Sequence, residues 1–265
     1  MNIKVGLDPE AFLFKDKQYY PAIGLFGGTK EAPIPAGEGG GIQEDNVMVE
    51  FNTAPASTLP MFKYQISLMK SIIEERAKNM GFEIKYDPIA TFSEDLLTHP
   101  QAREIGCSPD YNAWHGGRNE SVNASDLKNI RTASGHIHIG FEWLNNHPYN
   151  KIYMVQALEL MLGVPLSLIE SDKSVTRRQY YGMSGSFRRK PYGIEWRTPD
   201  NTWITKDVYV EYVWNTIIRI APKIKEYAQL ANRYGPNIRI AINNHDKTSA
   251  EALMKTCSIQ RIPIK

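Results

Sequence analysis

The sequence predicts an α+β fold, in which helices cover one face of a largely antiparallel, curved sheet and polar side chains line the other face. Two observations favour this fold. Short segments rich in β-branched and aromatic residues are mixed with amphipathic segments, without the regular β-α repeat of a doubly wound sheet. The chain has 265 residues, 42% of them hydrophobic and 23% charged, which is enough for a substantial core. We therefore expect residues 1–265 to form a single domain.

Five segments are expected to be strands, because each is short and rich in residues that favour an extended backbone. They are Asn2–Leu7, Ala11–Phe14, Asn46–Ala54, Gly135–Phe141 and Gly193–Thr198. The expected helices are Met61–Met80, Tyr149–Leu162, Asp207–Asn232 with a break at Pro222, and Lys247–Thr256. The last of these opens with a capping box between Thr248 and Glu251.

The composition argues against several classes of partner and site. A net charge of +2 from 31 basic and 29 acidic residues gives no electrostatic reason to expect a nucleic acid or a membrane surface as partner. No apolar run approaches the ~18 residues that a membrane span needs. The two cysteines, Cys107 and Cys257, are too few for a disulfide framework, and we expect Cys107 to pack rather than to act as a nucleophile. We therefore expect a soluble, cytoplasmic protein.

Side chains alternate across a strand, so parity shows what each face of the expected strands carries. One face is apolar, as with Ile137 and Ile139. The other face carries carboxylates, imidazoles and an arginine: Asp8, Glu10, Glu50, His136, His138, Glu195 and Arg197. The simpler interpretation is a solvated face, but such a face is usually rich in Lys, Glu and Thr. We therefore predict that these residues line a metal-containing cleft.

The ligand types indicate which metal the cleft holds. Carboxylates and imidazoles without a nearby cysteine suit Mg²⁺ or Mn²⁺ shared with phosphate oxygens better than a closed zinc site. The chain contains neither GxxxxGK[ST] nor a GxGxxG after a strand, which excludes P-loop and Rossmann nucleotide sites. Cations must hold the phosphates instead, and the candidates are Arg177, Arg178, Arg188, Arg189, Lys190 and Arg197. Glycines 182, 185 and 193 between them predict a flexible basic loop.

Five motifs follow one another between Gly6 and Trp203: GLDPEAFLF, QEDNVMVEFNTAP, GCSPDYNAWH, RTASGHIHIG and RRQYYGMSGSFRRKPYGIEWRTPDNTW. As a set they resemble the glutamine synthetase and glutamate-cysteine ligase superfamily, and most closely its phage-encoded amidoligases, the COOH-NH2 ligase type 2 family. The resemblance implies a glutamine synthetase-like catalytic domain that uses ATP with Mg²⁺ or Mn²⁺. It also implies a phage-encoded enzyme in the host cytoplasm, acting on a carboxylate substrate (amino acid or peptide) and an amine acceptor. Superfamily members range from monomers to large rings, so an oligomer is an open alternative.

The resemblance, with the residue types, assigns roles to the polar face. The expected metal ligands are Asp8, Glu10, Glu50, His136 and Glu195. The expected nucleotide-phosphate contacts are His138, Arg178, Arg188, Lys190 and Arg197. Catalysis is expected from Glu50, Glu195 and Arg197, with Glu44 or Asp45 as the base for the amine. Gly135 and Gly140 are expected to let a bulky ligand approach the strand.

The main hypothesis is therefore ATP-dependent formation of an amide or peptide bond through an acyl-phosphate. Such chemistry needs positioning and electrostatic stabilisation more than a covalent nucleophile. One alternative is a metal-dependent hydrolase that activates water with His136, His138 and the carboxylates, and that needs no ATP. Another is a non-catalytic binding protein on a ligase fold.

Overall fold

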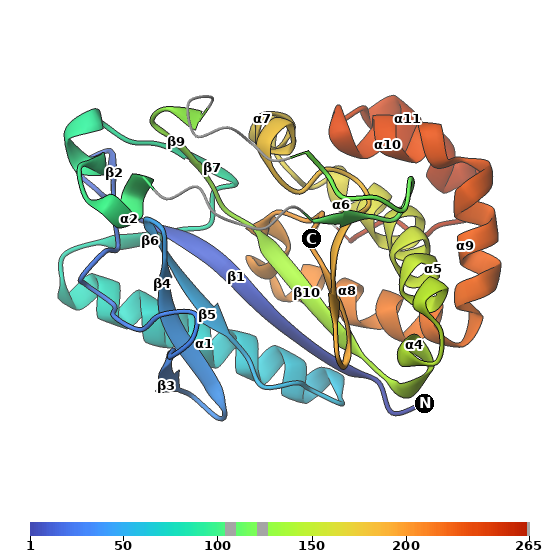
Figure 1. The fold of residues 1–265 in the computed structure, drawn as a ribbon, viewed down its shortest axis with the longest axis horizontal. Helices are drawn as coiled ribbons and strands as arrows, with labels where there is room; N and C mark the ends of the chain where they lie inside the picture. The colour runs from blue at the N-terminus through green and yellow to red at the C-terminus, as the bar shows by residue number, and fades with distance from the viewer. Residues whose placement is uncertain (104–109, 121–126, 264–265) are drawn as a thin grey trace.

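The strands that carry the polar residues belong to one antiparallel sheet (Figure 1). A computed structural model of the chain describes residues 1–103, 110–120 and 127–263. Within them, ten strands form a sheet with the order β3-β4-β5-β1-β10-β12-β11-β8, and β2 and β6 pair with a further stretch of β1. These strands are β1 (Lys4–Lys15), β2 (Gln18–Tyr20), β3 (Ile34–Ala36), β4 (Gly40–Asp45), β5 (Met48–Asn52), β6 (Glu83–Lys85), β8 (Tyr111–Asn112), β10 (Gly135–Gly140), β11 (Ser186–Lys190) and β12 (Gly193–Trp196). A separate pair joins β7 (Ile89–Thr91) to β9 (Ile130–Thr132).

Most of the helices pack against one face of this sheet and beyond one of its ends (Figure 1). The helices are α1 (Leu59–Asn79), α2 (Pro100–Arg103), α4 (Glu142–Asn145), α5 (Pro148–Leu158), α6 (Val164–Ser167), α7 (Lys173–Tyr180), α8 (Asp207–Ile220), α9 (Ile224–Arg233), α10 (Gly235–Asn243) and α11 (Lys247–Thr256). Helices α9, α10 and α11 lie beyond that end, whereas the short α2 lies at the other end near β2 (Figure 1). A π-helical segment, Glu159–Gly163, joins α5 to α6, so the helical path continues past Pro165. The expected break at Pro222 is a 3₁₀ turn, Ala221–Lys223.

The main hydrophobic core lies between the sheet and its helices. The strands contribute alternate residues that are almost fully buried, including Leu7, Phe51, Ile137, Ile139 and Trp196. Helices α1, α5 and α8 cover them with Phe62, Met154, Leu158 and Trp214. A second, smaller core around Phe12, Met48 and Phe92 closes one end of the opposite, polar face. The predicted α+β fold with one polar sheet face is confirmed.

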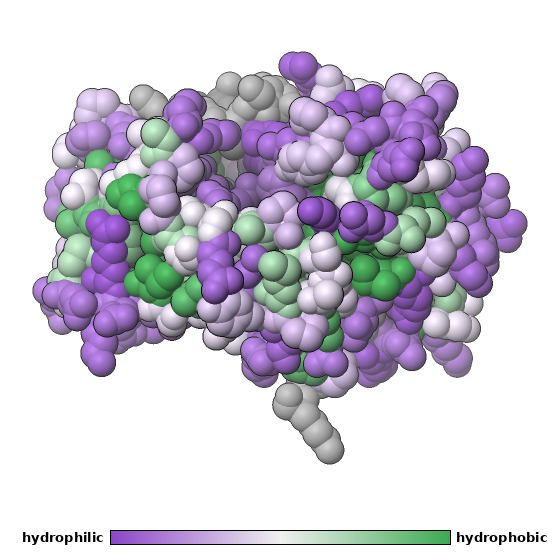
Figure 2. Space-filling model, turned by 90° about the horizontal axis from the view of Figure 1, so that it is seen from below, coloured by the Kyte–Doolittle hydropathy of each residue, from purple (hydrophilic) through white to green (hydrophobic). Residues whose placement is uncertain are grey.

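Among the helices that the structure describes, none is long and apolar enough to cross a bilayer. On the face seen in Figure 2, hydrophobic residues lie in small separate groups among hydrophilic ones. Scattered apolar residues of this kind are usual on protein surfaces.

Two local expectations are wrong. The segments expected as separate strands on either side of Pro9 are one strand, because β1 pairs with β10 up to Pro9 and with β5 from Glu10 onward. The expected capping box of α11 is also absent. Its N-cap is Asp246, whose carboxylate accepts a hydrogen bond from the Ser249 backbone N–H, and Thr248 lies inside the first turn.

Candidate active site

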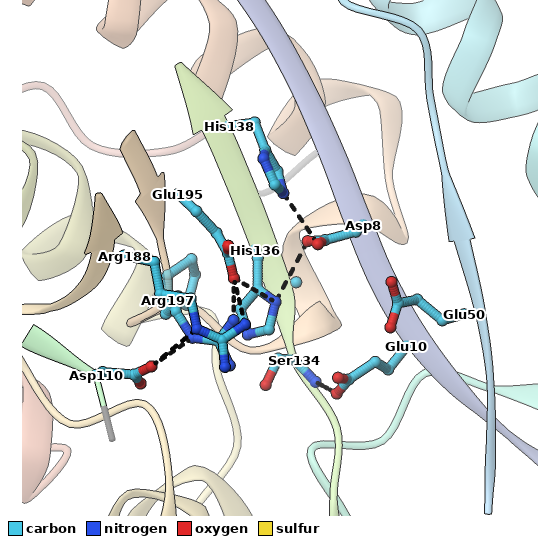
Figure 3. Close-up of polar contacts among 12 residues, drawn as sticks. Asp8, Glu10, Glu50, Asp110, Ser134, His136, His138, Arg188, Glu195 and Arg197 are labelled. Atoms are coloured by element: carbon cyan, nitrogen blue, oxygen red, sulfur yellow. Dashed lines mark hydrogen bonds and ion pairs between the residues drawn. The ribbon is translucent and has the colours of Figure 1, made fainter. Parts of the chain in front are cut away.

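Strand register brings the polar residues to one face of the sheet (Figure 3). Directly opposed residues of adjacent antiparallel strands have Cβ atoms about 4.5–5.5 Å apart and point to the same side. Strand β1 lies between β5 and β10, and β10 is followed by β12 and β11. The opposed pairs are Asp8 with His136, Glu10 with Glu50, His138 with Glu195, and Arg188 with Glu195.

The first acid group consists of Asp8, His138 and Glu195, one residue from each of three neighbouring strands. Each offers a ligand atom within 4.8 Å of the other two. The His138 Nε2 atom lies 2.9 Å from Asp8 Oδ2. His136 borders the group, with its Nδ1 atom 3.3 Å from Asp8 Oδ1 and 3.8 Å from Glu195 Oε1. Oxygen and imidazole donors this close together match the ligand set of a divalent cation.

The second acid group consists of Glu10, Asp45 and Glu50, whose ligand atoms also lie within 4.8 Å of one another. Glu10 and Glu50 are buried, with 7% and 8% of their surface exposed. Gln43 Nε2 donates to Glu50 Oε1 at 3.1 Å, and the Ser134 backbone N–H donates to Glu10 Oε2 at 2.7 Å. These donors hold the carboxylates in place but do not neutralise three adjacent acids.

The electrostatics of the first acid group separate its members. Burial alone would raise the pKa of Asp8, but the charge of His138 and hydrogen bonds from both imidazoles hold that pKa well below its usual range. Burial opposes protonation of His138, yet Asp8 outweighs burial and raises its pKa. Burial and, to a smaller extent, the charge of Arg197 lower the pKa of His136 to about 3, so His136 is neutral. Burial and the charge of Asp8 raise the pKa of Glu195.

The second acid group is under stronger repulsion. Burial raises the pKa of Glu50 well above its usual range, and the charges of Asp8, Asp45 and Glu10 raise it further. A buried carboxylate among carboxylates is ionised at low cost only beside a cation. The group therefore binds either a proton or a metal ion.

Cationic side chains surround Glu195. Lys190 Nζ lies 2.7 Å from Glu195 Oε2, Arg188 Nη1 lies 3.5 Å from Oε1, and the Arg197 guanidinium bonds Oε1. Arg197 is 1% exposed, and its Nε atom also contacts Asp110 Oδ1 at 2.9 Å. Guanidinium and ammonium groups in this position can bind phosphate oxygens next to the first acid group.

A cleft of about 650 Å³ opens beside both acid groups. Asp8, Glu50 and His138 form part of its wall. Further along, the lining includes three lysines, an aromatic pair and amides: Lys4, Lys30, Lys190, Phe141, Tyr192, Asn52 and Asn145. The cleft wall therefore combines the carboxylates of the acid groups with several ammonium groups, one of which, Lys190, pairs with Glu195.

A comparison with protein families finds a match in the second half of the chain. The model described as phage phiEco32-like COOH.NH2 ligase-type 2 matches residues 127–257, just under half of the 265 residues. The match supports the amidoligase family for this chain. The family name supports a carboxylate-amine ligase. The matched segment contains β10, β11 and β12 of the ligase, whereas β1 and β5 precede it. A search of curated proteins gives no match.

The ligase brings together most of the residues predicted from its sequence: Asp8, Glu10, Glu50, His136, His138, Arg188, Lys190, Glu195 and Arg197. Arg178 is elsewhere. It lies in α7, is 4% exposed, and bonds the Glu170 carboxylate. Its neighbour Arg177 is fully buried and donates to the Thr198 carbonyl and to Ser134 Oγ, each at 2.9 Å.

The expected flexible basic loop is wrong. Arg177 and Arg178 belong to helix α7, and Arg188 and Lys190 belong to strand β11, which pairs with β12. Backbone hydrogen bonds therefore fix both parts of the predicted loop.

The two glycines of β10 differ in their relation to the cleft: Gly140 lines it, as expected, whereas Gly135 is not among its lining residues. A Cβ atom at Gly135 would lie 2.5 Å from the Asp200 carbonyl oxygen and 2.6 Å from Trp203 Nε1. A Cβ atom at Gly140 would lie 3.1 Å from the Tyr192 carbonyl oxygen. Both glycines of the ligase accommodate its own neighbouring segments.

The two candidate bases have different surroundings. Glu44 accepts hydrogen bonds from the backbone N–H groups of Gly24, Phe26 and Gly27, at 2.6–2.9 Å. Its carboxylate therefore holds a loop of the ligase, while Asp45 belongs to the second acid group. Cys107 lies outside the described residues.

Sequence reasoning missed Asp110 and Tyr192. Asp110 is 5% exposed and contacts both Arg188 and Arg197. Tyr192 contacts His138 Nδ1 through its hydroxyl. The sequence could have indicated Asp110, because it lies in the motif GCSPDYNAWH. The residues around Tyr192 do not distinguish it from the other tyrosines of the ligase.

Proposed function

We propose that this ligase uses ATP and Mg²⁺ or Mn²⁺ to join a carboxylate to an amine through an acyl-phosphate. The observation that carries the proposal is the pair of acid groups on one sheet face, beside a cleft and next to clustered cations. The donors are carboxylate oxygens and imidazole nitrogens, which fit a hard divalent ion. The family name supports the ligation, and its reference to a phage supports an origin in a phage genome. Such an enzyme would act in the host cytoplasm.

We assign the two acid groups to two metal sites. Asp8, His138 and Glu195 would hold one ion, and Glu10, Asp45 and Glu50 would hold the other. This reverses the roles that the sequence suggested for the two histidines, because His138 completes the first group and His136 borders it. When bound, the ions would neutralise nucleotide phosphate oxygens.

The remaining residues would position the phosphoryl group. Arg188, Lys190 and Arg197 converge on Glu195 and would bind oxygens of the γ-phosphate. A carboxylate oxygen of the substrate, an amino acid or a peptide, attacks the γ-phosphorus, and the bond to ADP breaks. The amine then attacks the acyl carbon and phosphate leaves, while the amine proton passes to a nearby base, for which Asp45 is the candidate.

The test measures ADP and phosphate release from ATP with Mg²⁺ across a panel of amino acids, amines and wall peptides. Release should require both a carboxylate and an amine, and Glu195→Ala should abolish it while the fold stays intact, because that variant removes a ligand of the first acid group. Glu251→Ala is the matched control, since Glu251 lies in helix α11, outside both acid groups, and its exposed carboxylate pairs with Arg261.

Calorimetry of Mn²⁺-ATP binding provides a second measurement that does not depend on turnover. A fully active Glu195→Ala variant would contradict the site assignment. Turnover without ATP would contradict the ligase and favour the hydrolase, and absence of both release and Mn²⁺-ATP binding would favour a binding protein.

A further inference from the structure

Tyr192 lies at the tip of the hairpin formed by β11 and β12, and it rests on strand β10. Its backbone oxygen would lie 3.1 Å, and its ring Cδ2 atom 3.3 Å, from a Cβ atom at Gly140. A Cβ atom there would contact the tyrosine tightly, so the absence of a side chain at Gly140 lets Tyr192 lie close against the strand. Tyr192 is nevertheless 46% exposed, because its other side forms part of the cleft wall.

The two nitrogens of His138 have different partners. Nε2 faces Asp8 Oδ2 at 2.9 Å, inside the first acid group. Nδ1 contacts the Tyr192 hydroxyl, and the two ring centroids are 6.0 Å apart. A histidine that uses one nitrogen toward a metal or an acid usually has its ring orientation set by the partner of the other nitrogen. Here that partner is a phenol from another strand pair.

The same hairpin also contacts the neighbouring acid. Lys190, two residues before Tyr192, pairs with Glu195 Oε2 at 2.7 Å. The hairpin of β11 and β12 therefore contacts two members of the first acid group. The Lys190 ammonium group contacts Glu195, and the Tyr192 hydroxyl contacts His138. Because Tyr192 also lines the cleft, a ligand that fills the cleft contacts the ring that holds His138.

We propose that Tyr192 is a positioning residue: its hydroxyl fixes the His138 ring with Nε2 toward Asp8 and Glu195, and its ring links this orientation to occupation of the cleft. The metal readout of this inference rests on the proposed function. The measurement of stability does not rest on the proposed function. We expect the unfolding midpoint to stay unchanged without the hydroxyl, because a half-exposed tyrosine hydroxyl contributes little to folding.

The test compares Tyr192→Phe and Tyr192→Leu with wild type, and uses Mn²⁺ alone as the probe. Tyr192→Phe keeps the ring and loses the hydroxyl, so it should weaken Mn²⁺ binding about 10-fold or more while the unfolding midpoint stays unchanged. Tyr192→Leu should in addition raise the KM for ATP, because it removes the cleft wall. Tyr149→Phe is the matched control: this tyrosine is 58% exposed and does not line the cleft.

A second readout needs no metal. The imidazole ¹⁵N resonances of His138, assigned with His138→Gln, should shift in Tyr192→Phe and not in Tyr149→Phe. If Tyr192→Phe binds Mn²⁺ like wild type and its His138 resonances do not move, the inference is overturned. If wild type binds no Mn²⁺, the proposed function fails, and the metal-free resonances alone decide the role of Tyr192.

Discussion

Glu159 and Glu50 are both buried carboxylates, on opposite faces of the same sheet, and their surroundings differ completely. Glu159 lies in the π-helical segment behind β12 and is fully buried. It accepts hydrogen bonds from Trp196 Nε1 at 2.7 Å and from the hydroxyls of Thr198 and Ser184 at 2.6 Å. Glu50 has Gln43 as a donor and three carboxylates as charged neighbours.

The difference in surroundings indicates different roles: Glu159 attaches a strand to the helices, and Glu50 belongs to the candidate active site. Neutral donors satisfy Glu159, and the bonds attach β12 to the helices through its apolar side. Glu50 is held in a position that its own neighbours make unfavourable, which is common where stability and activity conflict. A buried acid that lacks adequate donors therefore indicates function more reliably than burial does.

The largest effect is expected for Glu50→Gln. The variant should lose ligation by about 100-fold or more, because it removes the charge of a proposed metal ligand in the second acid group. Its free energy of unfolding without metal should stay equal or rise by about 1 kcal/mol, because the repulsion among the carboxylates decreases. ADP release and urea unfolding measure the two quantities. A Glu50→Gln protein that unfolds more easily than wild type contradicts the assignment of Glu50 to the site.

A smaller, opposite effect is expected for Glu159→Gln. The amide group faces donors that need an acceptor, so the variant should lose about 2 kcal/mol of stability. Activity per folded molecule should fall far less than in Glu50→Gln. Urea unfolding gives the stability, and Ser184→Ala serves as the control, because it removes one donor and leaves the other two with the carboxylate. Unchanged stability in Glu159→Gln would show that the Glu159 carboxylate does not anchor β12 to the helices.

The smallest effect concerns Asp246, an exposed carboxylate that caps α11. Hydrogen bonds from Ser249 lower its pKa, so the ionised form stabilises the folded state. This contribution is complete above the ordinary Asp pKa of about 3.9 and disappears as the pH falls through the lowered pKa. The stability difference between wild type and Asp246→Ala should therefore shrink as the pH drops from 6 to about 2. Unfolding midpoints across that range measure it, and a constant difference would mean that the charge does not contribute.

Sequence reasoning succeeded where the cause is local. Alternation along a strand places Asp8 with Glu10, and His136 with His138, on one face whatever the rest of the chain does. It did not find helix α7, because the stretch KSVTRRQY has no apolar stripe; the helix buries two arginines, of which Arg178 pairs with Glu170 and Arg177 donates to backbone carbonyls. The partner of Arg178 is Glu170, and only the folded chain shows that this arginine is occupied.

The remaining errors concern choices among partners. Asp246 and Thr248 are both acceptable N-caps, and the backbone selects Asp246. Asp45 and Tyr192 join their groups through strand pairing and hairpin packing, which depend on long-range register. The anchoring of Glu159 depends on Trp196 and Thr198, residues far along the chain.

Strand β1 supplies one carboxylate to each acid group, and Asp8 and Glu10 are two residues apart. The repeat of an extended backbone places such residues about 7 Å apart along the strand. The spacing between the two groups is thus a property of the peptide geometry rather than of any loop. A single residue gained or lost between Asp8 and Glu10 would turn one of them to the opposite face, so one acid group would lose its carboxylate from β1 while the other kept its own.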